Sequence, residues 1–349
     1  MPETSENAIL IDAYSQIFRV FYAIMHLSNQ AGFPTNALLG FARLLLQLEK
    51  SYSPTRGCMF FDCGKPAFRL ELAPGYKSNR PPMPEDLVKQ MPLLRKLAGM
   101  FGWNVCECSN YEADDLIGAA VKSFPQQKFG IISSDKDLAQ LIDEHAFMLI
   151  PARSGGGFEK RGIEETQSKF SVSPAQMIDY LSLLGDNSDV IEGVPGIGPK
   201  TAANILQQCN SLAEFFAEPA RISNVKLQAK LLESRELLER NRKLITLCTR
   251  WPEETLGPAD KWLQKRSPDW AKIAEFAHEY ELKSILKELP AEFQNIAAAA
   301  VPQAPAAESK PAAGSSAADD LFSWSQEQQT AAGTVEQTEK KLPVQDSLF

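Results

Sequence analysis

The chain has 349 residues, of which 44% are hydrophobic and 23% are charged, a composition typical of a soluble globular protein with one large domain or two ordinary ones. No stretch approaches the roughly eighteen apolar residues of a membrane span, and the N-terminus lacks the order of a signal peptide, so we expect a cytoplasmic protein without membrane contact. The net charge of −8 disfavours nucleic-acid binding only if it is spread evenly. The segment from Ala291 onward holds 8 acidic and 3 basic residues, so most of the net negative charge lies in that segment.

Short apolar runs alternate with longer amphipathic ones over the first half of the chain. The runs at 8–12, 58–62, 104–108, 129–133 and 146–150 predict buried strands, and the stretches between them, such as 37–49 and 113–122, have helical periodicity. This alternation predicts an α/β fold with a mostly parallel sheet and flanking helices, whose ligands gather at the carboxyl ends of the strands.

The strand pattern stops after about Gly162. In AQMIDYLSLLG the apolar side chains of Met177, Ile178, Leu181 and Leu184 share one helical face, and further helical runs follow to about Leu289. From Ala291 the sequence is rich in Ala, Pro, Ser and Gln and too poor in branched apolar residues to form a core, which predicts a disordered tail.

Acidic residues follow four of the predicted strands at the point where each strand ends. Because parallel strands end at one edge of a sheet, the fold class brings these side chains together: Asp12, Asp62, Glu112, Asp114, Asp115, Asp135 and Asp137. Such a gathering is costly unless cations neutralise it. Oxygen ligands without His or Cys favour Mg²⁺ or Mn²⁺, and a two-metal phosphoryl-transfer site is the natural interpretation. The alternative is that each acid only caps a helix.

The stretch GVPGIGPKT, Gly193 to Thr201, is one residue away from a nucleotide-binding P-loop. Pro199 separates the second glycine of that pattern from Lys200 and is expected to take the first position of the following helix. The stretch also follows a helix instead of a strand. A glycine-rich turn between two helices can instead hold one phosphate of a nucleic-acid backbone without reading sequence, or it can be a plain connection. Asp186 and Asp189, spaced i and i+3, could face the same metal site.

Six motifs in order now resemble one family: ILIDAYS, FDCGKPAFRLEL, YKSNRPPMP, EADDLIG, SSDKDLAQL and LLGDNSDVIEGVPGIGPKTA. From about Ala8 to Leu289 the sequence resembles the 5′-nuclease domain of bacterial DNA polymerase I, within the flap-endonuclease superfamily. The resemblance implies a PIN- or resolvase-like nuclease domain at 1–162, with a mobile arch at about 63–86, and an all-helical helix-3-turn-helix DNA-binding subdomain at 163–290. The tail would occupy 291–349.

The same resemblance implies roles for individual residues. It makes all nine acids, the seven above with Asp186 and Asp189, metal ligands or their close neighbours, for two or more Mg²⁺ or Mn²⁺ ions. Lys77 and Arg80 would hold the scissile phosphate while Tyr76 stacks on a base beside the cut; without the resemblance this segment is a solvated basic loop. The residues expected to contact DNA are Arg19, Gly193, Gly196, Gly198, Lys200 and Thr201, with K⁺ assisting at the turn.

The sequence departs from the family pattern at two positions near the acids. Ala13 stands where a glycine is usual and Val190 where an asparagine is common. Neither change removes a ligand, so rate or substrate preference is affected more than activity. The chain also stops where a polymerase would begin, which implies a stand-alone nuclease.

The last five residues, QDSLF, resemble the bacterial sliding-clamp-binding pentapeptide. Gln345 would make polar contacts, and Leu348 and Phe349 would enter an apolar pocket of the clamp. The preceding tail would be the tether. The alternative is a chance match in a biased sequence, and for DDLFSW at 319–324 a stray hydrophobic cluster is the favoured interpretation.

We therefore predict a monomeric, metal-dependent 5′ nuclease with 5′→3′ exonuclease and flap-endonuclease activity. Its partner would be DNA with a 5′ flap, a nick or an RNA primer junction, recognised by shape and phosphate, and its task would be primer and flap removal in replication and repair. A PIN-type ribonuclease shares the acidic centre, and a non-catalytic junction-binding factor is the alternative from another class. No family carboxylate is missing from the sequence, which favours the active enzyme.

Overall fold

The computed structural model describes residues 7–24, 26–152 and 157–294, all within one compact unit of the chain. The strands are β1 (Asn7–Asp12), β2 (Gly57–Phe60), β3 (Asn104–Cys106), β4 (Lys128–Ile132), β5 (Ala146–Pro151), β6 (Phe158–Arg161), β7 (Gly185–Asp186) and β8 (Ile191–Glu192). The α-helices are α1 (Ala13–Ala23), α2 (Asn36–Tyr52), α3 (Ala67–Leu72), α4 (Glu85–Met100), α5 (Ala113–Ser123), α6 (Ile163–Phe170), α7 (Met177–Leu184), α8 (Pro199–Cys209), α9 (Leu212–Ala217), α10 (Val225–Glu233), α11 (Arg235–Ile245), α12 (Glu253–Leu256), α13 (Ala259–Leu263), α14 (Trp270–Glu279) and α15 (Lys283–Glu288). Short 3₁₀ helices are η1 (Asp137–Leu141), η2 (Pro174–Gln176), η3 (Pro219–Arg221) and η4 (Ala291–Phe293).

A six-stranded sheet in the order β3-β2-β1-β4-β5-β6 confirms the predicted α/β fold. All neighbours are parallel except β5 and β6. The five apolar runs became β1 to β5, whereas the sequence analysis missed β6. Its sequence, FEKR, lies at the sheet edge with Glu159 and Lys160 exposed, so it lacks the apolar run that marks a buried strand.

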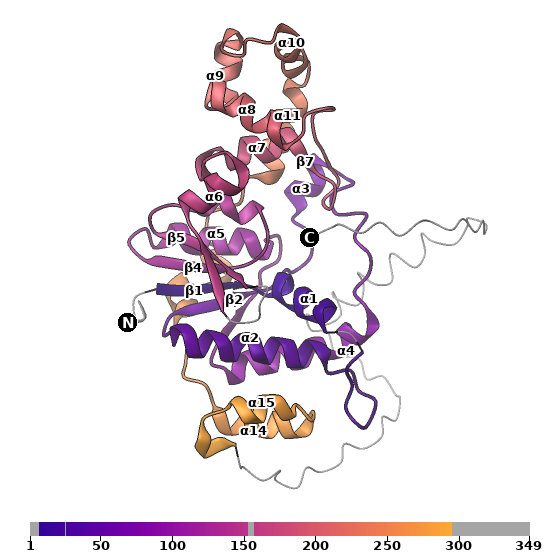
Figure 1. Ribbon diagram of the computed structural model, residues 1–349, viewed down its shortest axis with the longest axis vertical. Coiled ribbons are helices and arrows are strands. Elements are labelled where there is room, and N and C mark those ends of the chain that lie inside the picture. Colours follow the sequence, from indigo (N-terminus) through magenta and orange to yellow (C-terminus); the bar gives the residue numbers. More distant parts are fainter. Residues whose placement is uncertain (1–6, 25, 153–156, 295–349) are drawn as a thin grey trace, which may run out of the picture. The chain divides into compact units, whose positions relative to one another are not determined.

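Alternate side chains of the central strands enter two separate cores, one on each face of the sheet. Leu10 and Phe60 pack on the face covered by α5, while Ile11 and Met59 pack on the face covered by α1, α2 and α4. Figure 1 shows α2 along this second face. Burial on both faces explains why these strands read as continuous apolar runs.

The second half of the chain is mainly helical, as predicted, with one small exception. Helix α7 buries Met177 and Leu181 as expected, but Ile178 and Leu184 are only half-buried. After α7 the chain forms a two-residue antiparallel ladder, β7 with β8. None of the helices in the described residues is both long and apolar enough to span a bilayer.

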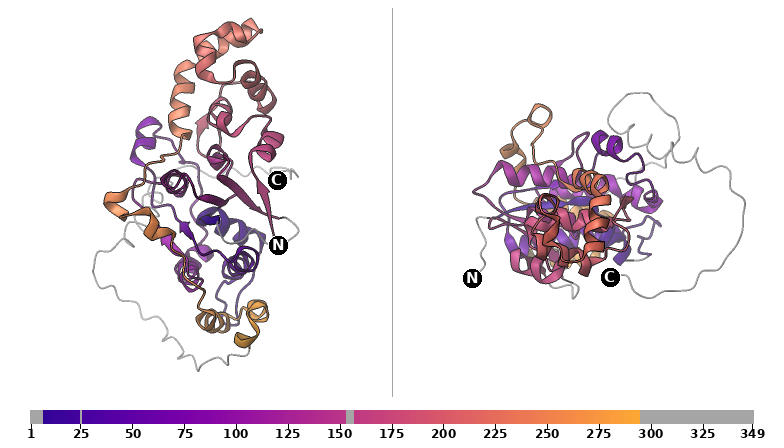
Figure 2. Two further views of the ribbon diagram at one scale, coloured as in Figure 1. Left: turned by 90° about the vertical axis from the view of Figure 1, so that its left-hand side faces the viewer. Right: turned by 90° about the horizontal axis from the view of Figure 1, so that it is seen from above.

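The last helices return to the sheet instead of joining the other helices. Helices α7 to α11 lie beyond the α5 face, whereas α14 and α15 lie on the opposite side, next to α2 (Figures 1 and 2). Phe276 and Ile285 are buried in the core of the α2 face. The connecting segment runs along the sheet domain, where the Arg266 N–H donates to Gly102 O at 3.0 Å. The 3₁₀ helix η4 extends the described fold to Gln294.

Candidate functional site

Asp12 ends β1 at the carboxyl edge of the sheet and also caps α1. Its Oδ1 accepts the Ser15 N–H at 3.1 Å, and its Oδ2 accepts the Ser133 hydroxyl, just past the end of β4, at 2.8 Å. Burial and the nearby charge of Asp62 raise the pKa of Asp12 to about 7. The capping interpretation and the cluster interpretation therefore both hold for this residue.

Asp62 and the start of α5 bring further acids to the same edge. Asp62 lies two residues past β2 and accepts the Ala113 N–H at 2.7 Å. Glu112 is the N-cap of α5, and Asp115 is the third residue of that helix, so the two form a capping box. Burial and the charge of Asp135 raise the pKa of Asp114 well above its usual value.

Asp135 and Asp137 follow β4, but they open the 3₁₀ helix η1 instead of an α-helix. The Asp137 N–H donates to Asp135 Oδ1 at 2.9 Å. Burial raises the pKa of both carboxyls. Asp186 lies on β7, where Lys136 Nζ is 2.8 Å from its Oδ2. Burial alone would raise the pKa of Asp186, but the contacts with Lys136 and Ser188 outweigh burial and lower this pKa.

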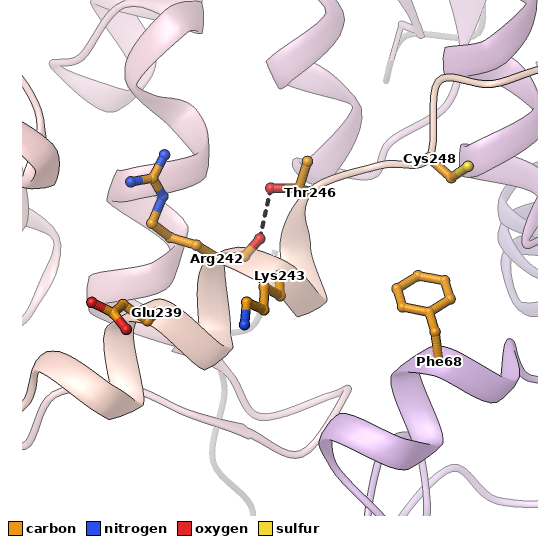
Figure 3. Close-up of a pocket in the computed structure, with 6 residues that line it drawn as sticks. All are labelled: Phe68, Glu239, Arg242, Lys243, Thr246 and Cys248. Carbon is orange, nitrogen blue, oxygen red and sulfur yellow. Dashed lines mark hydrogen bonds between the residues drawn. The ribbon is translucent and has the colours of Figure 1, made fainter.

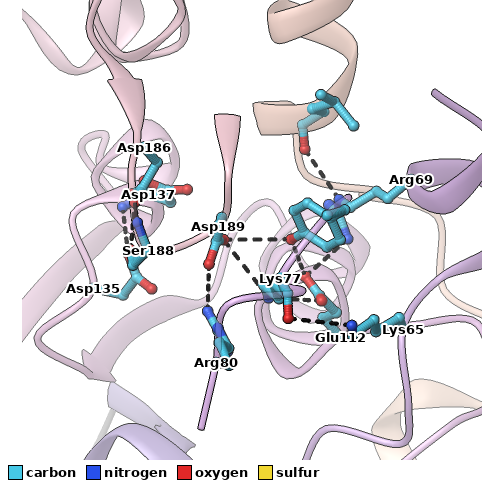
Figure 4. Close-up of polar contacts among 12 residues, drawn as sticks. Lys65, Arg69, Lys77, Arg80, Glu112, Asp135, Asp137, Asp186, Ser188 and Asp189 are labelled. Atoms are coloured by element: carbon cyan, nitrogen blue, oxygen red, sulfur yellow. Dashed lines mark hydrogen bonds and ion pairs between the residues drawn. The ribbon is translucent and has the colours of Figure 1, made fainter. Parts of the chain in front are cut away.

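Six charged side chains of alternating sign form a continuous series in the site, which we call the ion-pair row; Figure 4 labels all of them except Asp115. In order, the row is Asp115, Arg69, Glu112, Lys77, Asp189 and Arg80. The N···O distances along it are 2.6, 3.1, 2.6, 3.8 and 2.6 Å. Buried charges are tolerated when each is paired in this way.

Five carboxylates, which we call the acid cluster, form no ion pair within the described residues: Asp12, Asp62, Asp114, Asp135 and Asp137. Asp114 Oδ1 and Asp137 Oδ1 are buried without a hydrogen-bond partner. An oxygen-only donor set with unpaired buried oxygens fits a hard divalent cation. Within the described residues no three acidic, His or Cys side chains are close enough to hold a metal as they stand.

The segment YKSNR enters the site, although Tyr76 is placed differently from the expectation. Lys77 and Arg80 are in the ion-pair row, facing carboxylates. The Tyr76 side chain is only 3% exposed, its hydroxyl donates to Glu112 Oε2 at 2.9 Å, and Lys77 Nζ lies 5.0 Å from its ring centre. The ring is therefore covered in this structure, and its hydroxyl faces Glu112.

The turn from Gly193 to Gly198 lies between β8 and α8, with Pro199 at the first position of the helix as predicted. Only Gly196 has a positive φ, at 76°. Gly193 is required for another reason, because a Cβ atom there would lie 2.1 Å from the Leu184 carbonyl oxygen. Lys200 is exposed and Thr201 is half-buried. Lys230 Nζ of α10 donates to Pro195 O at 2.9 Å, which places an ammonium group beside this turn.

The other expected residues lie apart from the acid cluster or outside the described part. Arg19 is half-buried on α1, where its Nε donates to Gln16 Oε1 at 3.1 Å. Gln345, Leu348, Phe349 and the 319–324 segment lie outside the described residues. A cavity of about 680 Å³ opens between α3 and α11, lined by Phe68, Glu239, Arg242, Lys243, Thr246 and Cys248 (Figure 3).

The sequence analysis missed Arg69, Lys136, Ser133 and Lys230 as site residues. Arg69 lies in the quoted motif FDCGKPAFRLEL and Lys136 lies between two predicted acids, so a basic residue within an acidic motif was the available signal. Ser133 opens the quoted motif SSDKDLAQL, whereas no local pattern distinguishes Lys230 from an ordinary surface residue.

Family models match most of the chain. Residues 7–171 match the N-terminal resolvase-like domain of the 5′-3′ exonucleases, and residues 172–269 match the C-terminal SAM fold of the same family. The boundary between the two models follows α6, the helix that leads into the helical region.

Individual relatives agree with the family models. The chain is 34% identical to a 5′-3′ exonuclease of Aquifex aeolicus, over 80% of this chain and 94% of that one. It is 36% identical to DNA polymerase I of Bacillus subtilis, over 71% of this chain but only 28% of the relative, so it spans less than a third of that polymerase. A solved structure of the bacteriophage T5 flap endonuclease with DNA and metal ions has 22% identity and a TM-score of 0.58, covering 81% of this chain and 98% of that one; this likeness shows the fold.

Proposed function

Because the chain belongs to the 5′-3′ exonuclease family, we propose that it hydrolyses phosphodiesters of DNA as a structure-specific 5′ nuclease, with 5′→3′ exonuclease and flap-endonuclease activity. The observation that carries this proposal is the acid cluster, in which five carboxylates at the strand ends form no ion pair within the described residues. Bound divalent cations would supply the positive charge that these carboxylates lack. A metal centre of this kind would catalyse the hydrolysis of a phosphodiester.

We propose Mg²⁺ or Mn²⁺ as the cofactor, two ions or more, held by the acid cluster with Asp186 beside it. When bound, these ions would supply Lewis-acid activation of water and neutralise charge on the leaving oxygen. The donor set supports this assignment, as do the unpartnered oxygens of Asp114 and Asp137.

The remaining residues of the site would bind and orient the substrate. Lys77 and Arg80 are cations already aimed at the acids, so a phosphate arriving there exchanges a carboxylate partner for a phosphate partner. The turn at Gly196 and the first turn of α8 offer backbone N–H groups to the phosphates of a duplex. The role we propose is removal of 5′ flaps and RNA primers at nicks and junctions, by a monomer in the cytoplasm.

Cleavage of a 5′-labelled double-flap DNA tests this function. Wild-type protein in Mg²⁺ or Mn²⁺ is expected to release the flap near the junction, whereas Ca²⁺ supports binding alone. Asp12→Asn and Asp186→Asn are expected to bind the flap, measured by fluorescence anisotropy, with cleavage reduced at least about 100-fold. A wild-type protein that binds the flap and leaves it intact in both metals is a junction-binding factor, and one that cuts only single-stranded RNA is a PIN-type ribonuclease.

We also propose that Gln345, Leu348 and Phe349 bind a bacterial sliding clamp, which rests on the motif alone. Tethering would raise the effective concentration of the nuclease at the primer junction. A Leu348→Ala, Phe349→Ala variant is expected to keep its cleavage rate without the clamp and to lose any stimulation by it. Equal stimulation of both proteins would contradict the proposal.

A further inference from the structure

Arg69 on α3 is buried at the centre of four hydrogen bonds. Its side chain is only 2% exposed, and its Nη1 and Nη2 donate to Asp115 Oδ2 and Oδ1 at 2.6 and 2.8 Å. Nη1 also donates to Glu112 Oε2 at 3.1 Å, and Nε donates to the Leu244 carbonyl at 3.0 Å. A guanidinium held at Nη1 and Nη2 by one bidentate carboxylate and at Nε by a carbonyl is fixed in orientation as well as in position.

Asp115 has no acceptor position left for a cation. Its Oδ1 accepts from Arg69 Nη2 and from the Cys248 N–H, the latter at 2.8 Å. Its Oδ2 accepts from Arg69 Nη1 and from the Glu112 N–H, the latter at 3.1 Å. A carboxylate offers about four lone-pair positions, and all of them are used. Asp115 is also completely buried, whereas its neighbour Asp114 is only partly buried and has an oxygen without a partner.

We propose that Arg69 is a positioning residue for the nuclease reaction and that Asp115 is its counter-ion instead of a metal ligand. This inference rests on the proposed function of the acid cluster. The Arg69–Asp115 pair fixes the start of α5, which carries Glu112 and Asp114, against α3 and against the end of α11. The family resemblance left Asp115 as either a metal ligand or a close neighbour, and the contacts assign it the second role.

The pair acts on the reaction through Glu112. Arg69 and Tyr76 both donate to Glu112 Oε2, which leaves Oε1 directed at Lys77, 2.6 Å away. Without Arg69, Glu112 Oε2 keeps only the Tyr76 hydroxyl as a donor, so the carboxylate that faces Lys77 is held less firmly. Leu244 lies in the last turn of α11 and accepts from Arg69, and the Cys248 N–H donates to Asp115, so the same pair connects the helical region to the acids.

Counting bound Mn²⁺ tests the assignment of Asp115 without relying on cleavage. Electron paramagnetic resonance of the full-length protein would give the number of bound ions for wild type, Asp115→Asn and the matched neighbour Asp114→Asn. We expect Asp115→Asn to bind as many Mn²⁺ ions as wild type and Asp114→Asn to lose at least one. Loss of an ion in Asp115→Asn would overturn the assignment.

Single-turnover cleavage of a double-flap DNA tests the positioning role. Removing Arg69 alone leaves Asp115 buried and unpaired, which risks misfolding, so the informative variants are Arg69→Lys and the neutral pair Arg69→Gln, Asp115→Asn. Each is expected to lower the cleavage rate about 10–100-fold with the DNA dissociation constant in Ca²⁺ within about threefold of wild type. The double variant is expected to be no worse than Asp115→Asn alone, because the two residues act as one unit.

Two results would refute the positioning role. One is a double variant with a lowered melting temperature and an unchanged cleavage rate, which describes a purely structural pair. The other is a double variant that cleaves much more slowly than Asp115→Asn alone, which would show that the two residues do not act as one unit. If wild-type protein does not cleave the flap, the proposed function fails. The Mn²⁺ count and the unfolding midpoints of wild type, Arg69→Lys, Asp115→Asn and the double variant still test the pairing of Arg69 with Asp115.

Discussion

Asp12 is expected to destabilise the metal-free protein at neutral and alkaline pH. Its pKa rises from 3.8 to about 7 on folding because of burial and the charge of Asp62. The folded state therefore holds a proton on Asp12 that the unfolded chain releases above about pH 4, so stability falls as the pH rises from about 4 to 7. A rise of this size corresponds to about 4 kcal/mol once the pH exceeds the folded pKa.

Replacing Asp12 by Asn removes the charge and keeps the local contacts. The amide oxygen can still accept the Ser15 N–H, and the Ser133 hydroxyl can rotate to accept from the amide nitrogen. We therefore expect Asp12→Asn to be more stable than wild type by about 2–4 kcal/mol at pH 8 in EDTA, with a difference near zero at pH 4. The variant is expected to be inactive, so stability and function are opposed at this residue.

Urea unfolding followed by circular dichroism, at several pH values and with EDTA or Mg²⁺, measures this difference. Mg²⁺ is expected to stabilise wild type more than Asp12→Asn, because only wild type presents the full carboxylate set. Asp86→Asn on the exposed start of α4 is a matched control, for which we expect a change within about 0.5 kcal/mol. An Asp12→Asn protein no more stable than wild type at pH 8 would refute the electrostatic reasoning.

Three further substitutions probe the substrate-binding residues. Lys77→Met is expected to lower the single-turnover cleavage rate at least about 100-fold while flap affinity in Ca²⁺ changes little; a large loss of affinity with a normal rate would contradict its place beside the acids. Gly193→Ala is expected to cost about 1–3 kcal/mol of unfolding free energy and to weaken duplex binding, because its Cβ would meet the Leu184 carbonyl at 2.1 Å. Gly198→Ala, where a Cβ meets nothing within 4 Å, is the matched control, and equal losses in both would show that the close approach is unimportant. Lys230→Met is expected to weaken duplex binding and to reduce the slope of log affinity against log salt by about one, and an unchanged slope would exclude a phosphate contact.

The position of the acids could be predicted from the sequence because it follows from topology. Parallel strands end at one edge, so locating β1, β2 and β4 by their apolar runs was sufficient to place Asp12, Asp62 and Asp135 together. No knowledge of side-chain conformation was needed for that step. Pro199 could be placed at the start of α8 on local grounds, because its ring is compatible with the first position of a helix.

The pairing of the acids could not be predicted, because it depends on residues that are distant in the sequence. Arg69 and Asp115 are 46 positions apart, and nothing local to either residue indicates that they meet. The burial of the Tyr76 ring could not be predicted either, because YKSNR on its own indicates a solvated basic loop, yet the chain there turns inward. Strand β6 was missed since an edge strand needs no apolar run.

The return of α14 and α15 to the sheet has a consequence for how the newly made chain folds. One core of the sheet contains side chains from the first 60 residues together with Phe276, Leu282 and Ile285. During synthesis, α2 and α4 therefore leave the ribosome long before the segment that covers them. The apolar surface of α2 and α4 that α14 and α15 cover stays exposed to solvent and to chaperones until translation has passed residue 289. A nascent chain arrested before α14 is accordingly expected to bind chaperones, whereas resistance to proteolysis is expected only for chains arrested after α15 has emerged.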